Sequence, residues 1–297
     1  MSTSKKGILA IALILFCSAS IQAQETEDVI KIDTNLVTIN VSVKGNKGRL
    51  LPGLRREDFL VIEEGNQMQV EFFDNYGPAS IVFVVDLSSS MQGKKWKNLK
   101  AGMKEFLASA HTGNDYTLIG FSDRPSIIAS SANEDELWQV INTLVPAGNT
   151  ALYDAMLLGL NVLADIPRRH KALILFSDGE DNFSRSVLTE VREECLTRRA
   201  TIYTVGILND YYLPFSNGRT GKELLKELAN VTGGLAHFPK AYEIKEVLKE
   251  IKADLASQYT LSYYPLQKSP GRRRVQVSMT QTYQSLKLRY QQYYTVR

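Results

Sequence analysis

The 297-residue sequence predicts an α/β fold with a doubly wound, mostly parallel sheet, inserted into a small all-β sandwich that the two flanks of the chain form together. Two observations support this prediction. Between residues 79 and 257, short apolar runs alternate with segments of helical periodicity, which is typical of a parallel sheet with helices on both faces. Residues 29–76 and 258–297 instead alternate apolar with polar side chains, as strands with one buried face do.

The strands of the parallel sheet are expected at the apolar runs, because strands covered on both faces are almost continuously hydrophobic. The expected strands are 81–85, 116–121, 172–176 and 202–207, with shorter ones at 126–129 and 236–238. Apolar side chains recur with helical spacing between them. The expected helices are 94–111, 134–144, 152–164, 186–199, 222–232 and 241–257.

The two flanks contain further short strands separated by turns. In each flank the apolar surface is too small to form a core alone, so we expect the flanks to pack against each other as one sandwich. The three arginines from 272 to 274 are expected at a turn. The expected strands are 36–43, 59–63 and 70–73 in the first flank, and 259–263, 275–279 and 286–290 in the second.

The first 23 residues have the pattern of an export signal. Lys5 and Lys6 precede an apolar stretch at 8–16, and small residues then lead to an expected cleavage after Ala23. A membrane anchor is the alternative, but the stretch is short for a bilayer span. Lipidation at Cys17 is disfavoured by the bulky residue before it. We therefore expect an exported protein, either periplasmic or extracellular, with no transmembrane segment after the signal is removed.

Charge and cysteine content exclude several classes of function. Without the signal, 33 basic and 32 acidic residues remain, which gives no electrostatic footprint for nucleic acid or an anionic membrane. Cys195 would then be the single cysteine, so neither an internal disulfide nor a cysteine-based metal site is possible. Its place on an expected helix favours a buried core thiol.

Hydroxyl and carboxylate side chains gather in three loops that we expect at the same edge of the sheet. Two of the loops follow strands, at 86–90 and 177–181, and one precedes a helix, at 148–150. The carboxyl ends of parallel strands meet at one edge of a sheet, where ligands of this architecture bind. Hard divalent cations prefer such oxygen ligands, so the pattern predicts a site for Mg²⁺, or for another divalent cation such as Mn²⁺ or Ca²⁺. The five candidate ligands are Asp86, Ser88, Ser90, Thr150 and Asp178.

Each candidate ligand also has an ordinary structural explanation. The hydroxyls precede helices and could act as N-caps, and Asp178 could form a turn with Gly179. It is the joint occurrence of all five that favours a metal site. Asp154 could support the ligands, whereas Glu180 and Asp181 are expected at the rim or in solvent.

The motif Asp-x-Ser-x-Ser at Asp86, followed by Thr150 and by Asp178 in a Ser-Asp-Gly turn, resembles the metal-ion-dependent adhesion site (MIDAS) of the von Willebrand factor A family. The resemblance covers residues 79–257 and implies the Rossmann-like fold of that family. It implies that Ser88, Ser90 and Thr150 bind the metal directly and that the two aspartates act mostly through water. It also implies that a carboxylate of a partner protein takes the open position.

The flanks are similar to a bacterial group of von Willebrand factor A-related proteins common in Acidobacteria. The similarity lies in Asn35-Leu36-Val37, in Gly53-Leu54 with Asp58-Phe59, and in Tyr263-Tyr264. Residues 209–220 are expected to be an insertion near the metal edge of the sheet. Its aromatic residues could contact a partner, although an ordinary ordered loop is an equal alternative. These residues are Tyr211, Tyr212 and Phe215.

The function expected from these features is a secreted or periplasmic, metal-dependent protein-binding module rather than an enzyme. The three histidines occur in unrelated contexts, and no hydrolase or metalloprotease motif is present. One alternative is a Mg²⁺-dependent phosphatase or hydrolase that uses Asp86 as its nucleophile. Another is a structural protein of an envelope assembly, which would need no metal.

Overall fold

The computed structural model describes residues 36–45, 48–75, 77–109, 111, 113–168, 170–208, 220–280 and 286–296. The expected signal peptide lies outside these residues, as do Tyr211, Tyr212 and Phe215. Within the described ranges, no helix combines the length and the apolar character that a membrane crossing requires.

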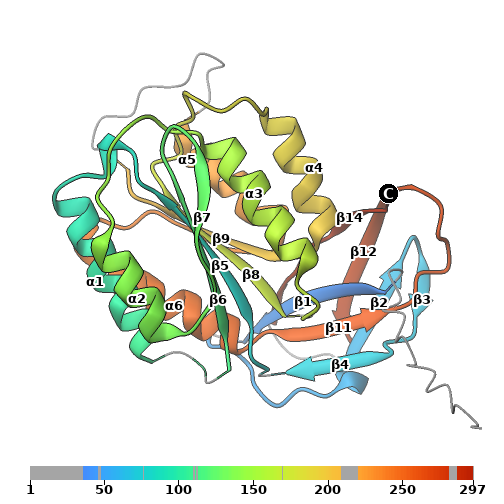
Figure 1. Ribbon diagram of the computed structural model, residues 1–297. Helices are drawn as coiled ribbons and strands as arrows, with labels where there is room; N and C mark the ends of the chain where they lie inside the picture. The colour runs from blue at the N-terminus through green and yellow to red at the C-terminus, as the bar shows by residue number, and fades with distance from the viewer. Residues whose placement is uncertain are drawn as a thin grey trace, which may run out of the picture. The chain divides into compact units, whose positions relative to one another are not determined.

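A six-stranded sheet forms the centre of the α/β part, in the order β10-β9-β8-β5-β6-β7 (Figure 1). All neighbours are parallel except β7, which pairs antiparallel with β6 at one edge. Every residue of β5 is buried, as its apolar sequence predicts. The strands are β5 (Ser80–Asp86), β6 (Asp115–Phe121), β7 (Pro125–Ala132), β8 (Lys171–Ser177), β9 (Thr201–Gly206) and β10 (Ala236–His237).

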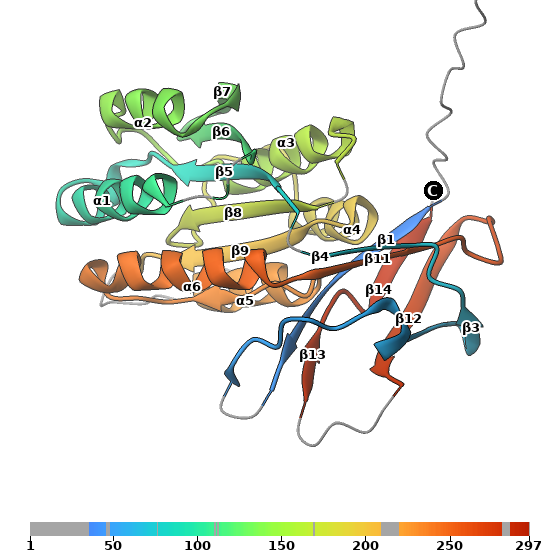
Figure 2. The same cartoon turned by 90° about the horizontal axis from the view of Figure 1, so that it is seen from below.

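Helices cover both faces of this sheet (Figure 2). Phe83 of β5 packs in a core with side chains of α1, α2 and α6, whereas Val84 faces the opposite core with α3, α4 and α5. The mostly parallel, doubly wound sheet is therefore confirmed. The helices are α1 (Lys94–Ala108), α2 (Glu134–Thr143), α3 (Leu152–Asp165), α4 (Leu188–Arg198), α5 (Gly221–Asn230) and α6 (Ile244–Ala256).

The flanks form two four-stranded sheets, and each sheet combines strands from both flanks. The first has the order β13-β1-β11-β4 and the second β14-β12-β2-β3. One hydrophobic cluster joins both sheets, with Phe59 and Tyr259 at a ring-centroid distance of 5.2 Å, so the expected sandwich is confirmed. The strands are β1 (Val37–Lys44), β2 (Phe59–Glu63), β3 (Asn66–Met68), β4 (Phe72–Asn75), β11 (Tyr259–Tyr263), β12 (Gly271–Met279), β13 (Lys287–Arg289) and β14 (Tyr293–Val296).

Some details of the flanks differ from the prediction. The arginine triplet lies in β12 rather than in a turn, and Arg273 is buried because its guanidinium donates to the backbone oxygen of Ser269 at 2.8 Å. The single strand expected at 70–73 is replaced by β3 and β4, and β14 was not expected. β14 begins after a polar pair whose Gln291 side chain donates to a backbone oxygen of α4, a long-range contact.

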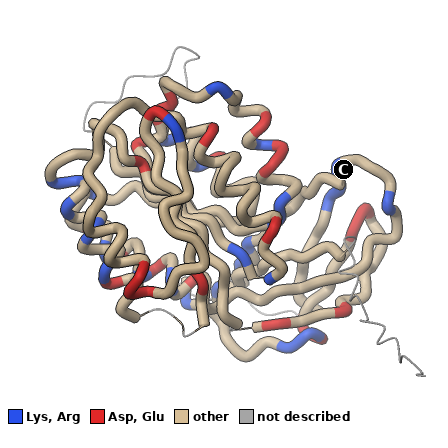
Figure 3. Tube along the Cα trace, viewed as in Figure 1, with Lys and Arg blue, Asp and Glu red and all other residues tan. Residues whose placement is uncertain are grey.

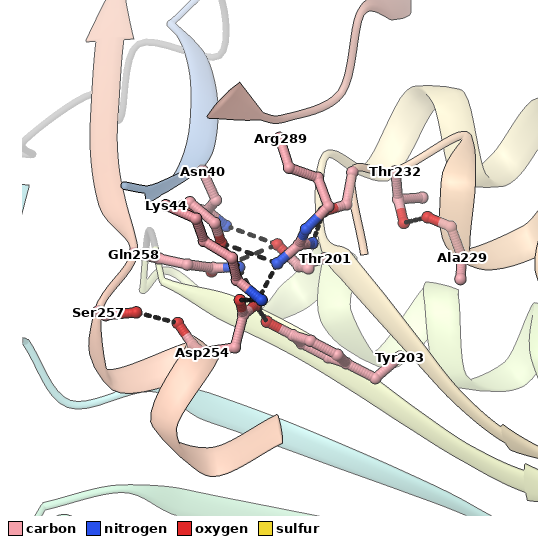
Figure 4. Close-up of polar contacts among 12 residues, drawn as sticks. Asn40, Lys44, Thr201, Tyr203, Ala229, Thr232, Asp254, Ser257, Gln258 and Arg289 are labelled. Carbon is pink, nitrogen blue, oxygen red and sulfur yellow. Dashed lines mark hydrogen bonds and ion pairs between the residues drawn. The ribbon is translucent and has the colours of Figure 1, made fainter. Parts of the chain in front are cut away.

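A buried polar cluster joins the sandwich to the α/β part (Figure 4). At its centre lies Asp254 of α6, whose side chain is 2% exposed. Its Oδ2 accepts hydrogen bonds from the Tyr203 hydroxyl of β9 at 2.7 Å and from the Arg289 guanidinium of β13. Ser42 of β1 donates to the same oxygen at 3.3 Å. The cluster thus ties both flanks of the chain to the helix that precedes β11.

Candidate functional site

The candidate site begins at Asp86, the last residue of β5. Because β5 and β8 are adjacent and parallel, the loops that follow them leave the sheet side by side. Asp86 Oδ2 accepts a hydrogen bond from Ser177 Oγ at 2.9 Å, and Oδ1 accepts one from the backbone N–H of Ser88 at 2.8 Å. The side chain is fully buried. Asp86 therefore fixes both loops relative to each other.

Three further candidate ligands lie next to one another above Asp86. The hydroxyl oxygens of Ser88 and Ser90 are hydrogen-bonded at 3.0 Å, and Ser90 Oγ donates to Asp178 Oδ2 at 2.8 Å. A 3-10 turn at Ser89–Met91 holds the two serines on the same side. The structure thus brings two hydroxyls and a carboxylate into one continuous chain of oxygens.

Thr150 lies on the third loop, which is joined to the first by two hydrogen bonds. Ser89 N donates to Gly148 O, and Gly148 N donates to Ser89 Oγ, both at 3.1 Å. The Thr150 N–H donates to Asn182 Oδ1 at 2.9 Å, and its carbonyl accepts the N–H groups of Asn182 and Phe183. These contacts therefore join the loop of Thr150 to the loops that follow β5 and β8.

Two glycines allow the Asp178 loop to pack against the start of α5. Gly179 has a φ of +82°, and a Cβ there would lie 2.6 Å from the backbone oxygen of Gly221. A Cβ on Gly221 would in turn lie 2.5 Å from the backbone oxygen of Asp178. Such distances leave no room for a side chain at either position. The close approach of the two backbones therefore fixes the position of Asp178.

The carboxylates of the site carry an electrostatic cost. The pKa of Asp86 is raised to about 6, mainly by burial and in part by the nearby charge of Asp178, although hydrogen bonds from Ser88 and Ser177 oppose the rise. Burial also raises the pKa of Glu180, again with a contribution from Asp178. A cation placed among these groups would offset their charge.

The residues fit a hard divalent cation. In the part of the chain that the structure describes, no group of three or more His, Cys, Asp and Glu side chains is arranged to hold a metal ion. The cluster of Ser88, Ser90 and Asp178 is not of that kind, because hydroxyl groups supply many of its oxygen atoms. Mg²⁺ and Ca²⁺ accept oxygen ligands, and Mg²⁺ commonly keeps several waters. Hydroxyl groups that bind the ion directly, together with carboxylates that bind it through water, suit that coordination.

The other carboxylates considered from the sequence have structural roles. Asp154 accepts the N–H groups of Arg185 and Ser186, at 3.1 and 3.0 Å. Asp181 Oδ1 accepts a hydrogen bond from Ser184 Oγ at 2.6 Å and one from the N–H of Tyr153. Both residues hold the loop after β8 against the start of α3.

Sequence reasoning missed two residues that position the candidate ligands. Ser177 bonds Asp86, and Asn182 bonds the backbone of Thr150. Ser177 directly precedes Asp178, but its contact with Asp86 depends on which strand lies beside β5. Asn182 has no recognisable signal in the sequence.

Comparison with known proteins relates the part of the chain around this site to a known domain family. Residues 81–180 match the model of the von Willebrand factor type A domain. The inter-alpha-trypsin inhibitor heavy chain H1 of Sus scrofa is 29% identical over 147 residues, which is 44% of this chain and 16% of that protein. Heavy chain H4 of Homo sapiens is 26% identical over 208 residues, 63% of this chain and 21% of that protein. The chain thus spans about a fifth of the curated relatives it matches.

Solved structures share the fold. A von Willebrand factor type A protein from Catenulispora acidiphila superposes with a TM-score of 0.53 at 11% identity, covering 88% of this chain and 72% of that one. Proximal thread matrix protein 1 from the mussel byssus, with a zinc-occupied MIDAS motif, gives a TM-score of 0.50 at 19% identity, covering 64% and 48%. The family match includes β5, β8 and the loops that carry the candidate ligands, and this chain accordingly contains a von Willebrand factor type A domain.

Proposed function

We propose that this protein is an exported binding module whose five candidate ligands hold a divalent cation, most suitably Mg²⁺, and that an acidic side chain of a partner protein completes the coordination. The contact that best supports the proposal is the 2.8 Å hydrogen bond from Ser90 to Asp178, because it joins ligands from two different loops. The family match adds support, since von Willebrand factor A domains are modules that typically mediate protein binding through a MIDAS.

The environment of Asp86 favours binding over catalysis. A nucleophilic carboxylate must reach its substrate, whereas Asp86 is fully buried. Both of its oxygens already accept hydrogen bonds, one from Ser88 and one from Ser177. The hydrolase alternative is tested by incubating the protein with p-nitrophenyl phosphate and Mg²⁺. Turnover that Asp86→Asn abolishes would support an enzyme and contradict the binding proposal.

Apolar side chains flank the candidate ligands and would suit a protein partner. Phe183 is 50% exposed, and its N–H donates to the carbonyl of Thr150. Val145 is 79% exposed, and Ala147, which follows it in the same loop, donates to the carbonyl of Leu87 at 2.6 Å. Apolar and aromatic residues are typical of interface centres. We propose that they surround the partner's carboxylate, with Tyr211, Tyr212 and Phe215 as further contacts.

A metal titration tests the site. The double variant Asp86→Ala/Ser88→Ala should lose Mg²⁺ binding in isothermal titration calorimetry, together with EDTA-sensitive capture of a partner from envelope extract. The matched control Ser130→Ala/Asp135→Ala also removes one hydroxyl and one carboxylate, but from exposed positions in β7 and α2. It should bind as the wild type does. Unchanged metal and partner binding in the first variant would show that the site is wrongly assigned.

Export is tested separately from binding. The proposed signal predicts that the protein recovered from the envelope or the medium begins at Gln24, because cleavage follows Ala23. N-terminal sequencing of the recovered protein measures this directly. A protein that retains Met1 and fractionates with the cytoplasm would contradict the proposed localisation. It would not bear on the metal site, which the metal titration tests independently.

A further inference from the structure

Lys95, in the first turn of α1, has an unusual environment for a lysine. Its Nζ is buried and has no hydrogen-bond partner among the residues that the structure describes. Lys94, Lys97 and Lys104 of the same helix are exposed, and the lysines of α1 appear as blue segments of the tube at the left of Figure 3. A buried ammonium without a hydrogen bond is costly, since it gives up its hydration without direct compensation. Its position therefore requires a compensating interaction.

That compensation comes from the carboxylates of the candidate metal site. Burial lowers the pKa of Lys95, whereas the negative charges of Asp178, Asp86 and Glu180 raise it. The ammonium thus lies in the field of three carboxylates, two of which are candidate ligands. Because Nζ is buried, it is not placed to meet a partner's carboxylate at the surface. Its electrostatic interaction is with the carboxylates of the site itself.

We propose that Lys95 is a resident counter-charge of the metal site, which offsets the ligand carboxylates when no metal is bound and lowers the affinity of the site for divalent cations. The inference rests on the proposed metal site. Two positive charges held near the same carboxylates repel each other, and each reduces the gain from the other. The lysine would then set the ion concentration at which the module becomes competent to bind.

The test compares Lys95→Met with Lys94→Met in the full chain. Lys94 is the exposed neighbour in the same helical turn, so its replacement removes an equal charge without removing a buried one. Isothermal titration with MgCl₂ should show that Lys95→Met binds Mg²⁺ about three- to tenfold more tightly than the wild type. Lys94→Met should match the wild type, and Lys95→Arg should keep the weaker affinity because it retains the charge.

A melting curve in EDTA provides the second measurement. Without metal, Lys95→Met should melt at a lower temperature than the wild type, because the carboxylates lose their counter-charge. In saturating MgCl₂ this difference should shrink or reverse. If Lys95→Met does not fold, Lys95→Gln replaces it in both measurements.

The outcomes separate the two proposals. If the wild type binds Mg²⁺ and Lys95→Met binds it equally or more weakly, the proposed role of Lys95 is wrong, but the proposed metal site is not contradicted. An unchanged melting temperature in EDTA would also overturn it. If the wild type binds no Mg²⁺ at all, the proposed function fails, and the inference fails with it.

Discussion

Ser90 and Asp178 are 88 residues apart in the sequence, yet the hydroxyl of Ser90 donates to Oδ2 of Asp178 at 2.8 Å. The contact exists because β5 and β8 are neighbours in the sheet and release their loops at the same edge. The hydrogen bond joins two loops that are far apart in the sequence. The first prediction concerns this contact.

Ser90→Ala removes the hydroxyl and leaves Asp178 without this donor. Hydrogen bonds to charged groups are stronger than neutral ones, but this one is only partly buried. We expect the free energy of unfolding in EDTA to fall by about 1 kcal/mol, and Mg²⁺ affinity to fall at least about tenfold, since a proposed ligand is lost. Urea denaturation and calorimetric titration measure the two effects. Ser90→Thr keeps a hydroxyl and should retain most of both; an alanine variant with wild-type affinity would exclude Ser90 as a ligand.

Gly221→Ala tests the close packing of α5 against the Asp178 loop. The added methyl would lie 2.5 Å from the backbone oxygen of Asp178, so one of the two backbones must move. Overpacking of this kind costs about 1–3 kcal/mol, and we also expect weaker Mg²⁺ binding. The control is Gly65→Ala, where φ is +84° but no atom lies within 4 Å of the new Cβ. It should lose about 1 kcal/mol from backbone strain and bind Mg²⁺ normally. Equal metal affinity in both variants would contradict the role of this packing.

Arg289→Met tests the cluster between the sandwich and the α/β part. It leaves Asp254 buried without its guanidinium partner, which typically costs about 3–5 kcal/mol. The double variant Asp254→Asn/Arg289→Met should lose less than the sum of the two single changes, because it leaves no unpaired charge. Lys44→Met is the control, since its ammonium is 4.0 Å from Asp254 and partly exposed; it should cost less than about 1 kcal/mol. Urea denaturation measures all four. A small loss in Arg289→Met would mean that the pair contributes little.

His170 should make stability depend on pH. Burial lowers its pKa below the ordinary value of 6.5, although a hydrogen bond between Nδ1 and the carbonyl of Gly77 partly opposes this. The unfolded chain then binds a proton more readily than the folded protein as the pH falls below about 6.5, so acid lowers stability through this group. His170→Asn cannot titrate, and the difference between its urea midpoints at pH 7.5 and 5.5 should be smaller than in the wild type. Some dependence should remain, since burial also lowers the pKa of His237. An identical difference in both proteins would contradict this contribution.

Local sequence was sufficient for the sheet and for the edge where the candidate ligands gather. The apolar run at 81–85 predicts a strand buried on both faces, and Asp86 follows this run directly as the last residue of β5. By contrast, the arginines at 272–274 suggested a turn, because charge is a poor marker of strands. They lie in β12, where Arg272 is exposed and Arg273 is buried through contacts with Ser269.

Features that depend on lateral neighbours could not be predicted. Ser177 contacts Asp86 because β8 lies beside β5. The order of the strands in the sheet cannot be predicted from the sequence of either strand. Asp254 is polar and lies on a helix, where solvent exposure is the default. Its burial depends on Arg289, which comes from the opposite flank of the chain. The carboxylates whose charges act on the buried Nζ of Lys95 likewise come from other segments of the chain.

The chain leaves the sandwich through β4 and returns through β11, and these strands are hydrogen-bonded neighbours, with Asn75 opposite Tyr259. Everything between them is therefore attached at two points that lie side by side. Such a segment could be lengthened, shortened or exchanged for a related domain while the sandwich kept its own pairing. A transplanted domain would need closely spaced ends, an acidic group to meet Arg289 and an acceptor for Gln291. In this arrangement the sandwich could stay unchanged while the inserted domain is exchanged. New binding specificities could then arise by replacing the inserted domain rather than by redesigning the whole protein.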